Sequence, residues 1–205
     1  TLGLLCFIWQ CWMPVTRSWA ELAQVAEVTP MRERLALARQ AAEADPLDTE
    51  LLRFLSSLLV AQAGEERGEL FRRKASEARG QLQDWLERDS VSHMNWAFAG
   101  DRSLELAARA QRVDVEPQAD LIFARDCYRG AVARYPTSVM RRVQLAAVLA
   151  IMGDELGAQR EIDEAWRLSD ITPHADKKLE TQQIWLPFDV AELEPYVDAE
   201  QRAVW

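Results

Sequence analysis

The stretch "YPTSVMRRVQLAAVLAIMGDELGAQREIDEAWRLSD", Tyr135–Asp170, decides which fold to expect. Apolar residues recur at helical spacing on both sides of the turn pair Gly153 and Asp154. Small residues, Ala146, Ala158 and Ala165, fall on the apolar sides of the two segments. The stretch therefore predicts two helices joined by a short turn. It also raises the question whether this is a single hairpin or one copy of a repeat.

The composition favours a helical fold with a substantial buried core. The chain has 205 residues, enough to bury a substantial core, and only 8 Gly and 8 Pro. No run of alternating β-branched residues predicts a sheet. The net charge of -9 argues against a nucleic-acid partner, which would need a basic face.

The same spacing of small and apolar residues recurs twice upstream. Each copy would hold a first helix and a second helix, and a lone second helix, "RERLALARQAAEADP", precedes them. The matching residues of the two upstream copies are Leu52, Leu55, Ser56, Leu59, Ala78, Leu82 and Trp85, and then Trp96, Ala99, Gly100, Ala124, Tyr128 and Ala131.

The junction between copies has a constant length. The last residue of each second-helix pattern is Pro46, Ser90 or Pro136, and the next first helix should begin three residues later. The first helices are therefore predicted to start at Thr49, His93 and Val139. Because single matches arise easily in alanine-rich helices, this constant junction carries more weight than any one copy.

The pattern resembles the tetratricopeptide repeat, in which small residues let two antiparallel helices approach closely. The resemblance covers roughly residues 32–170 and implies an all-α fold, a solenoid of about three and a half helical hairpins. Arg142, Ser103 and Asp170 depart from the residue types usual in this repeat. An irregular helical bundle is the alternative. Ten and twelve extra residues, near "AGEERGELFRR" and "AQRVDVEPQAD", are expected to form enlarged polar turns.

First helices line the concave surface of such repeats, so the resemblance implies a partner groove. We expect it to take a helix or an extended segment of a protein partner. The Lys and Asn pattern of chaperone-binding members is missing, which disfavours a chaperone adaptor. The N-terminal or C-terminal segment of this chain could instead fill the groove. The predicted groove residues are Arg53, Ser57, Ala97, Asp101, Val143 and Ala147.

The small and groove positions should differ in their tolerance of size. Overpacking a close helix contact is costly, so a bulky residue should damage the fold at Ala146. Ala147 would face the groove and accept it. Equal damage at both residues would indicate an ordinary bundle.

Residues 1–16, "TLGLLCFIWQCWMPVT", carry no charge and form an apolar N-terminal helix in our interpretation. The run is short for a membrane span, which needs about 20 residues, so a truncated transmembrane helix is expected. The alternatives are a buried helix packed on the repeats and a processed targeting segment. Residues 17–31 would be a linker or helix. Arg17, Arg32 and Arg34 favour the cytoplasmic side of a bacterial inner membrane.

Two stretches, "LGLLCFIWQCWMPVTRSW" and "ITPHADKKL", resemble the C-terminal portion of bacterial O-antigen ligase-like membrane proteins. These proteins act in cell-surface polysaccharide assembly, and some carry a repeat domain after their last span. The resemblance implies a full-length glycan ligase or polymerase. Its catalytic residues lie elsewhere in that family, and none maps onto this sequence.

No residue set in the chain predicts catalysis or a cofactor. His93 and His174 lack partners at metal-ligand spacing, and no Gly-rich phosphate loop or Gly-x-Ser-x-Gly turn occurs. Asp163 and Glu164 are expected on a solvated helix face. The three cysteines, Cys6, Cys11 and Cys127, do not suggest a disulfide framework.

Residues 171–205 are expected to form a capping helix and an acidic tail, with Phe188 or Tyr196 packing back on the repeats. The sequence thus predicts a non-catalytic, membrane-tethered interaction domain that binds a protein or peptide, with no cofactor, no metal and no nucleic acid. The alternative is a free soluble helical scaffold whose N-terminal helix lies in its core.

Overall fold

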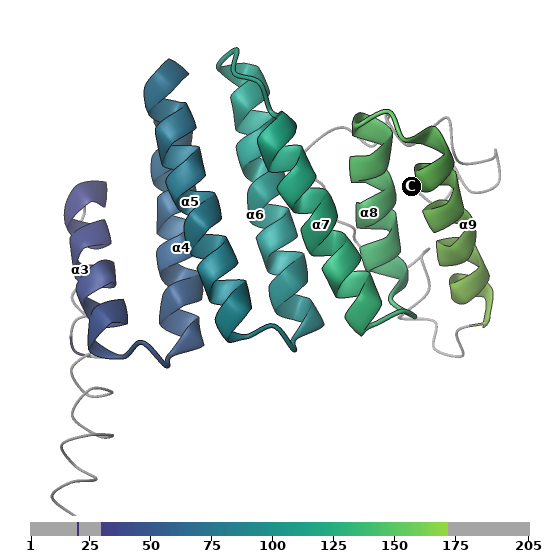
Figure 1. The fold of residues 1–205 in the computed structure, drawn as a ribbon, viewed down its shortest axis with the longest axis horizontal. Helices are drawn as coiled ribbons and strands as arrows, with labels where there is room; N and C mark the ends of the chain where they lie inside the picture. Colours follow the sequence, from purple (N-terminus) through teal and green to yellow (C-terminus); the bar gives the residue numbers. More distant parts are fainter. Residues whose placement is uncertain (1–19, 21–29, 172–205) are drawn as a thin grey trace, which may run out of the picture. The chain divides into compact units, whose positions relative to one another are not determined.

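The computed structural model describes Ala20 and residues 30–171 of the chain (Figure 1). The described residues form helices and contain no strand, which confirms the all-α class. The chain divides into two compact units, Thr1–Asp89 and Ser90–Trp205. The helices are α3 (Met31–Ala44), α4 (Thr49–Gly64), α5 (Gly68–Arg88), α6 (His93–Arg112), α7 (Gln118–Arg134), α8 (Val139–Ile151) and α9 (Glu155–Ile171).

The first unit contains an antiparallel hairpin of α4 and α5, with α3 packed on α4 (Figure 1). The chain turns at residues 65–67, and Gly68, the first residue of α5, takes a φ of +56° that suits glycine. Every residue that the repeat pattern assigns to the hairpin contact is buried. These residues are Leu52, Leu55, Ser56, Leu59, Ala78, Leu82 and Trp85.

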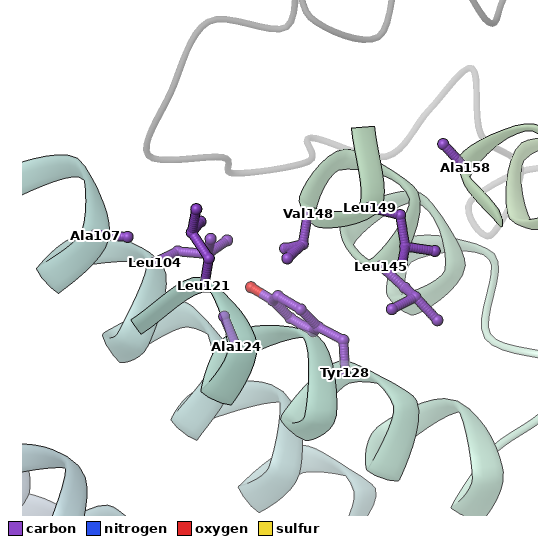
Figure 2. Packing of buried hydrophobic residues seen from close by; sticks show 9 residues of the cluster. All are labelled: Leu104, Ala107, Leu121, Ala124, Tyr128, Leu145, Val148, Leu149 and Ala158. Atoms are coloured by element: carbon purple, nitrogen blue, oxygen red, sulfur yellow. The ribbon is translucent and has the colours of Figure 1, made fainter. Parts of the chain in front are cut away.

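The second unit contains two antiparallel hairpins, α6 with α7 and α8 with α9, and α7 packs against α8 (Figure 1). One apolar cluster joins all four helices through Leu104, Tyr128, Leu149 and Ala158. In Figure 2 the side chain of Tyr128 lies among Leu121, Ala124 and Val148. A second cluster joins α8 to α9.

The predicted starts of the three first helices are confirmed, because α4, α6 and α8 begin at Thr49, His93 and Val139. The residue before each start caps the helix with its side chain. Asp48 Oδ1 accepts from the backbone N–H of Glu50 and Leu51 at 2.9 and 3.2 Å. Ser92 and Ser138 accept in the same way from the third residue of their helices. The constant junction therefore reflects a turn and cap built alike each time.

The small residues lie where two helices of a hairpin approach closely. A Cβ added at Gly100 would stand 2.9 Å from Cε1 and Cζ of Tyr128, closer than side chains normally pack. Ala146, Ala158 and Ala165 are fully buried between α8 and α9. The turn of that hairpin carries Gly153 at a φ of +79°, and Asp154 Oδ1 accepts from the backbone N–H of Gly157 at 3.0 Å.

The expectation of enlarged turns is wrong. The extra residues of the first unit start α5 earlier, at Gly68, and those of the second extend α6 to Arg112. The first insertion is rich in Glu and Arg, which favour helix, and Ala110, Gln111 and Arg112 of the second insertion continue α6. The pair of Arg72 with Glu69 adds support along α5. The insertions therefore lengthen the hairpins, and short turns remain.

Several predictions fall outside the described residues: the apolar segment 1–16, nearly all of the linker 17–31, and the segment 171–205 beyond Ile171. No helix among the described residues combines the length and apolar character needed to cross a bilayer.

Candidate functional site

The predicted groove surface of the first unit lies on α4 and is polar. Arg53 is exposed and forms an ion pair with Glu50, one turn earlier on the same helix. Ser57 is half-buried, and its Oγ donates to the carbonyl of Arg53 at 3.1 Å. Because Arg53 is exposed and Ser57 is partly exposed, α4 offers a charged and hydroxyl-bearing surface to a partner.

A cavity of about 350 Å³ in this unit lies on the other side of α4. Its apolar lining includes Leu52, Leu55 and Leu59. These residues are spaced about half a turn around α4 from Arg53 and Ser57. The cavity rim holds Arg39, which pairs with Glu77 from α5. The cavity is therefore a feature separate from the predicted groove.

In the second unit the predicted residue Ala97 is buried, with 1% of its surface exposed, whereas Asp101 is half-buried and hydrogen-bonded. Tyr128 donates its hydroxyl to Asp101 Oδ1 at 2.6 Å, and Gln144 Nε2 donates to the same oxygen at 3.1 Å. Arg141 Nη1 then donates to Gln144 Oε1 at 2.7 Å. We call Asp101, Tyr128, Gln144 and Arg141 the polar network. It joins α6, α7 and α8.

The polar network changes the acidity of its members. Burial raises the pKa of Asp101 above its usual value, although the hydrogen bond from Tyr128 and the charge of Arg141 act in the opposite direction. Burial, together with the Asp101 carboxylate, raises the pKa of Tyr128. Tyr128 thus stays protonated and donates its hydrogen to the carboxylate.

Val143 and Ala147, the predicted groove residues of α8, are fully buried, with 0% of their surface exposed. Neither side chain is open to a partner in this structure. The expectation that a bulky side chain would be tolerated at Ala147 therefore does not fit its surroundings. Of the six predicted residues, the structure leaves Arg53 and Ser57 as the most accessible, on α4.

The polar network was not predicted. The sequence marked Tyr128 only as a packing residue and Asp101 only as a groove residue. The signal that could have joined them is the glycine at Gly100, because a glycine opposite an aromatic residue leaves room for its ring. Gln144 carried no sequence signal that we could identify.

Within the described residues, no group of three or more His, Cys, Asp or Glu could hold a metal ion. His93 packs against Tyr135 with ring centroids 4.9 Å apart. Glu164 pairs with Arg167, whose hydrogen bond lowers the pKa of the Glu164 carboxyl. Cys127 is a free, buried thiol whose pKa is raised by burial, so it is unreactive.

Compared with known families and with curated proteins, the sequence matches no family model and no curated protein.

Proposed function

We propose that this chain is a non-catalytic interaction domain that binds a protein or peptide through the first-helix side of tetratricopeptide-like hairpins. The observation that carries the proposal is that successive hairpins are constructed from the same features at corresponding positions. Each first helix starts after a side-chain cap, and each hairpin buries small residues at its contact. Stacks of such hairpins act as binding scaffolds because each one buries its apolar face and leaves one side of its first helix for a partner.

The binding surface favoured by the geometry is the side of α4 that carries Glu50, Arg53 and Ser57. Its charges suit an extended or helical segment with polar and acidic groups, because the guanidinium of an exposed arginine binds a carboxylate through two hydrogen bonds. Arg53 is already paired with Glu50, so a partner carboxylate would share the guanidinium with it.

Charge reversal at Arg53 tests this proposal. Arg53→Glu should abolish co-purification of a partner from native membranes, and Arg72→Glu should leave it intact. The control is matched because Arg72 also forms an exposed ion pair with a glutamate one turn earlier, on the same unit. Loss of the partner with both variants, or with neither, would contradict binding through α4.

We further propose a membrane tether in residues 1–16 and the setting of an O-antigen ligase-like protein. The tether is supported by the uncharged apolar run of residues 1–16, and the setting is supported by the sequence resemblance. An upstream reading frame that encodes several further apolar spans would support the O-antigen ligase-like setting. Release of the full chain from membranes by a carbonate wash would contradict the tether and favour a free scaffold.

A further inference from the structure

The middle of α8 is buried on every side. Residues 143–149, seven in succession, are all buried. A helix makes one turn in about 3.6 residues, so this stretch covers every direction around the axis. Among the described helices, α7 and α9 are the ones that pack along α8, and Gln144 adds a bond to α6.

These neighbours leave one direction unaccounted for. Ala146 packs with Ile162 on α9, while Gln144 reaches Asp101 on α6. Ala147 lies about 100° around the helix from Ala146 and about 60° from Gln144, so it points between the two neighbours. Ala147 shares the buried cluster of α8 with α9, and its 0% exposure requires cover on the side between α9 and α6 as well.

The preceding hairpin shows what stands in this direction. When His93 is aligned with Val139, Ala97 corresponds to Val143 and Asp101 to Ala147. In the preceding hairpin this side of α6 is beside the next first helix, α8, because Asp101 accepts from Gln144. Val143 and Ala147 therefore face the place of a following helix.

Trp166 on α9 points to the same place independently. When Tyr128 is aligned with Ile162, Trp166 corresponds to Val132 on α7. Val132 packs against the apolar cluster that contains Leu145, Val148 and Leu149 of the next helix, α8. The indole N–H of Trp166 is buried and has no acceptor among the described residues. Buried donors in native proteins are nearly always hydrogen-bonded, so this N–H also calls for a neighbour.

We propose that the C-terminal segment of this same chain, residues 172–205, docks on the surface formed by Val143, Ala147 and Trp166, which we call the terminal face. The proposal deepens the proposed function and rests on it, because Val143 and Ala147 belong to the groove surface predicted for the second unit.

Continuity and composition favour this occupant. The segment follows α9 directly, and α9 ends at Ile171, near Trp166 in the sequence. It contains the apolar run "IWLPF", residues 184–188, which can cover Val143 and Ala147. A helix as long as α8 needs about 13 residues to span about 20 Å, and the segment is longer than this.

The test uses the full chain with Cys6→Ser and Cys11→Ser, leaving the buried Cys127 in place. Ala147→Cys reports on the terminal face, and Ala119→Cys on the exposed start of α7 is the matched control. We expect a maleimide to label Ala147→Cys at least about tenfold more slowly than the control, because labelling requires the segment to leave. Adding Trp185→Ser should restore fast labelling. Met140→Cys, two turns earlier on the same side of α8, replaces Ala147→Cys if that variant does not fold.

A thiol-reactive benzophenone on the same cysteine then identifies the occupant. Cross-links to peptides from residues 172–205 of the same molecule support the proposal. Cross-links to residues 1–29 or to a second copy of the chain overturn it, as does labelling as fast as the control. Binding of a partner through Arg53 is measured separately, so the terminal face and the proposed function can fail independently.

Discussion

A methyl group added at Gly100 tests the close helix contact on which the hairpins depend. The Cβ of an alanine would stand 2.9 Å from two ring atoms of Tyr128. The ring cannot retreat easily, because Tyr128 is fully buried and its hydroxyl is held by Asp101 at 2.6 Å. We expect Gly100→Ala to carry an overpacking cost of about 1 to 3 kcal/mol.

The helix propensity of alanine works in the opposite direction and must be removed from the measurement. Replacing glycine by alanine inside a helix gains up to about 1 kcal/mol. Gly80, exposed inside α5, has nothing within 4 Å of an added Cβ, so Gly80→Ala should show this gain alone. The difference between the two variants in the free energy of unfolding, measured in urea, isolates the packing cost.

A second substitution locates that cost. Tyr128→Leu removes the ring and should relieve the clash, so the double variant should show a favourable coupling of about 0.5 to 3 kcal/mol. At the positions that correspond to Gly100 and Tyr128, the other hairpins hold a small residue and an aliphatic one: Ser56 and Leu82 in one, Ala146 and Ile162 in the other. Equal stabilisation by Gly100→Ala and Gly80→Ala would refute the close contact.

Three further perturbations follow from the same geometry. Ala146→Trp and Ala147→Trp should each cost about 1 to 3 kcal/mol or more in the free energy of unfolding, because both residues are fully buried. Since Ala147 is covered as completely as Ala146, equal damage at the two residues does not distinguish a repeat from an ordinary bundle, and a wild-type melting curve for Ala147→Trp would contradict its burial. The raised pKa of Asp101 means that its ionisation destabilises the fold, so its contribution is fully present below its unfolded-state pKa, near 3.8, and is lost as pH rises through the raised pKa. Urea melts across this range should show Asp101→Asn gaining stability relative to wild type as pH rises, and a pH-independent difference would exclude Asp101 as the titrating group. Asp48→Ala should cost about 1 kcal/mol, because two backbone N–H groups lose their acceptor, and thermal melting without any shift would show that the cap is dispensable.

The helix starts could be predicted because they depend on local chemistry. Asp48, Ser92 and Ser138 each satisfy backbone donors within their own turn, so the sequence around each junction suffices. The buried small residues were also predictable, since Gly100 and Ala146 stand at helical spacing on an apolar side.

The prediction of enlarged turns is wrong because it treats the polar residues of the two insertions as a sign of turn structure. Polar residues such as Glu69 and Arg72 are also good helix formers, and their pairing along α5 continues the helix. Length alone could not distinguish a longer turn from a longer helix.

Whether a predicted groove residue is accessible or buried depends on which other elements pack beside its helix. Arg53 and Ser57 are accessible on α4, whereas Ala97, Val143 and Ala147 are buried. A helical period gives the direction in which a residue points, but only a three-dimensional arrangement shows whether another element lies there. The polar network depends on the same information, because Asp101, Tyr128 and Gln144 come from three helices.

Site-specific photo-cross-linking from α4 in living cells tests whether a protein partner binds on the first-helix side of the hairpins. A photo-reactive amino acid at Ser57 lies on the proposed binding surface, and one at Ser76, exposed on α5, is the control. We expect a discrete cross-linked product with a protein partner from Ser57, which is lost with Arg53→Glu and is not formed from Ser76. The same products from both positions, or no product from Ser57, would contradict binding through the first-helix side.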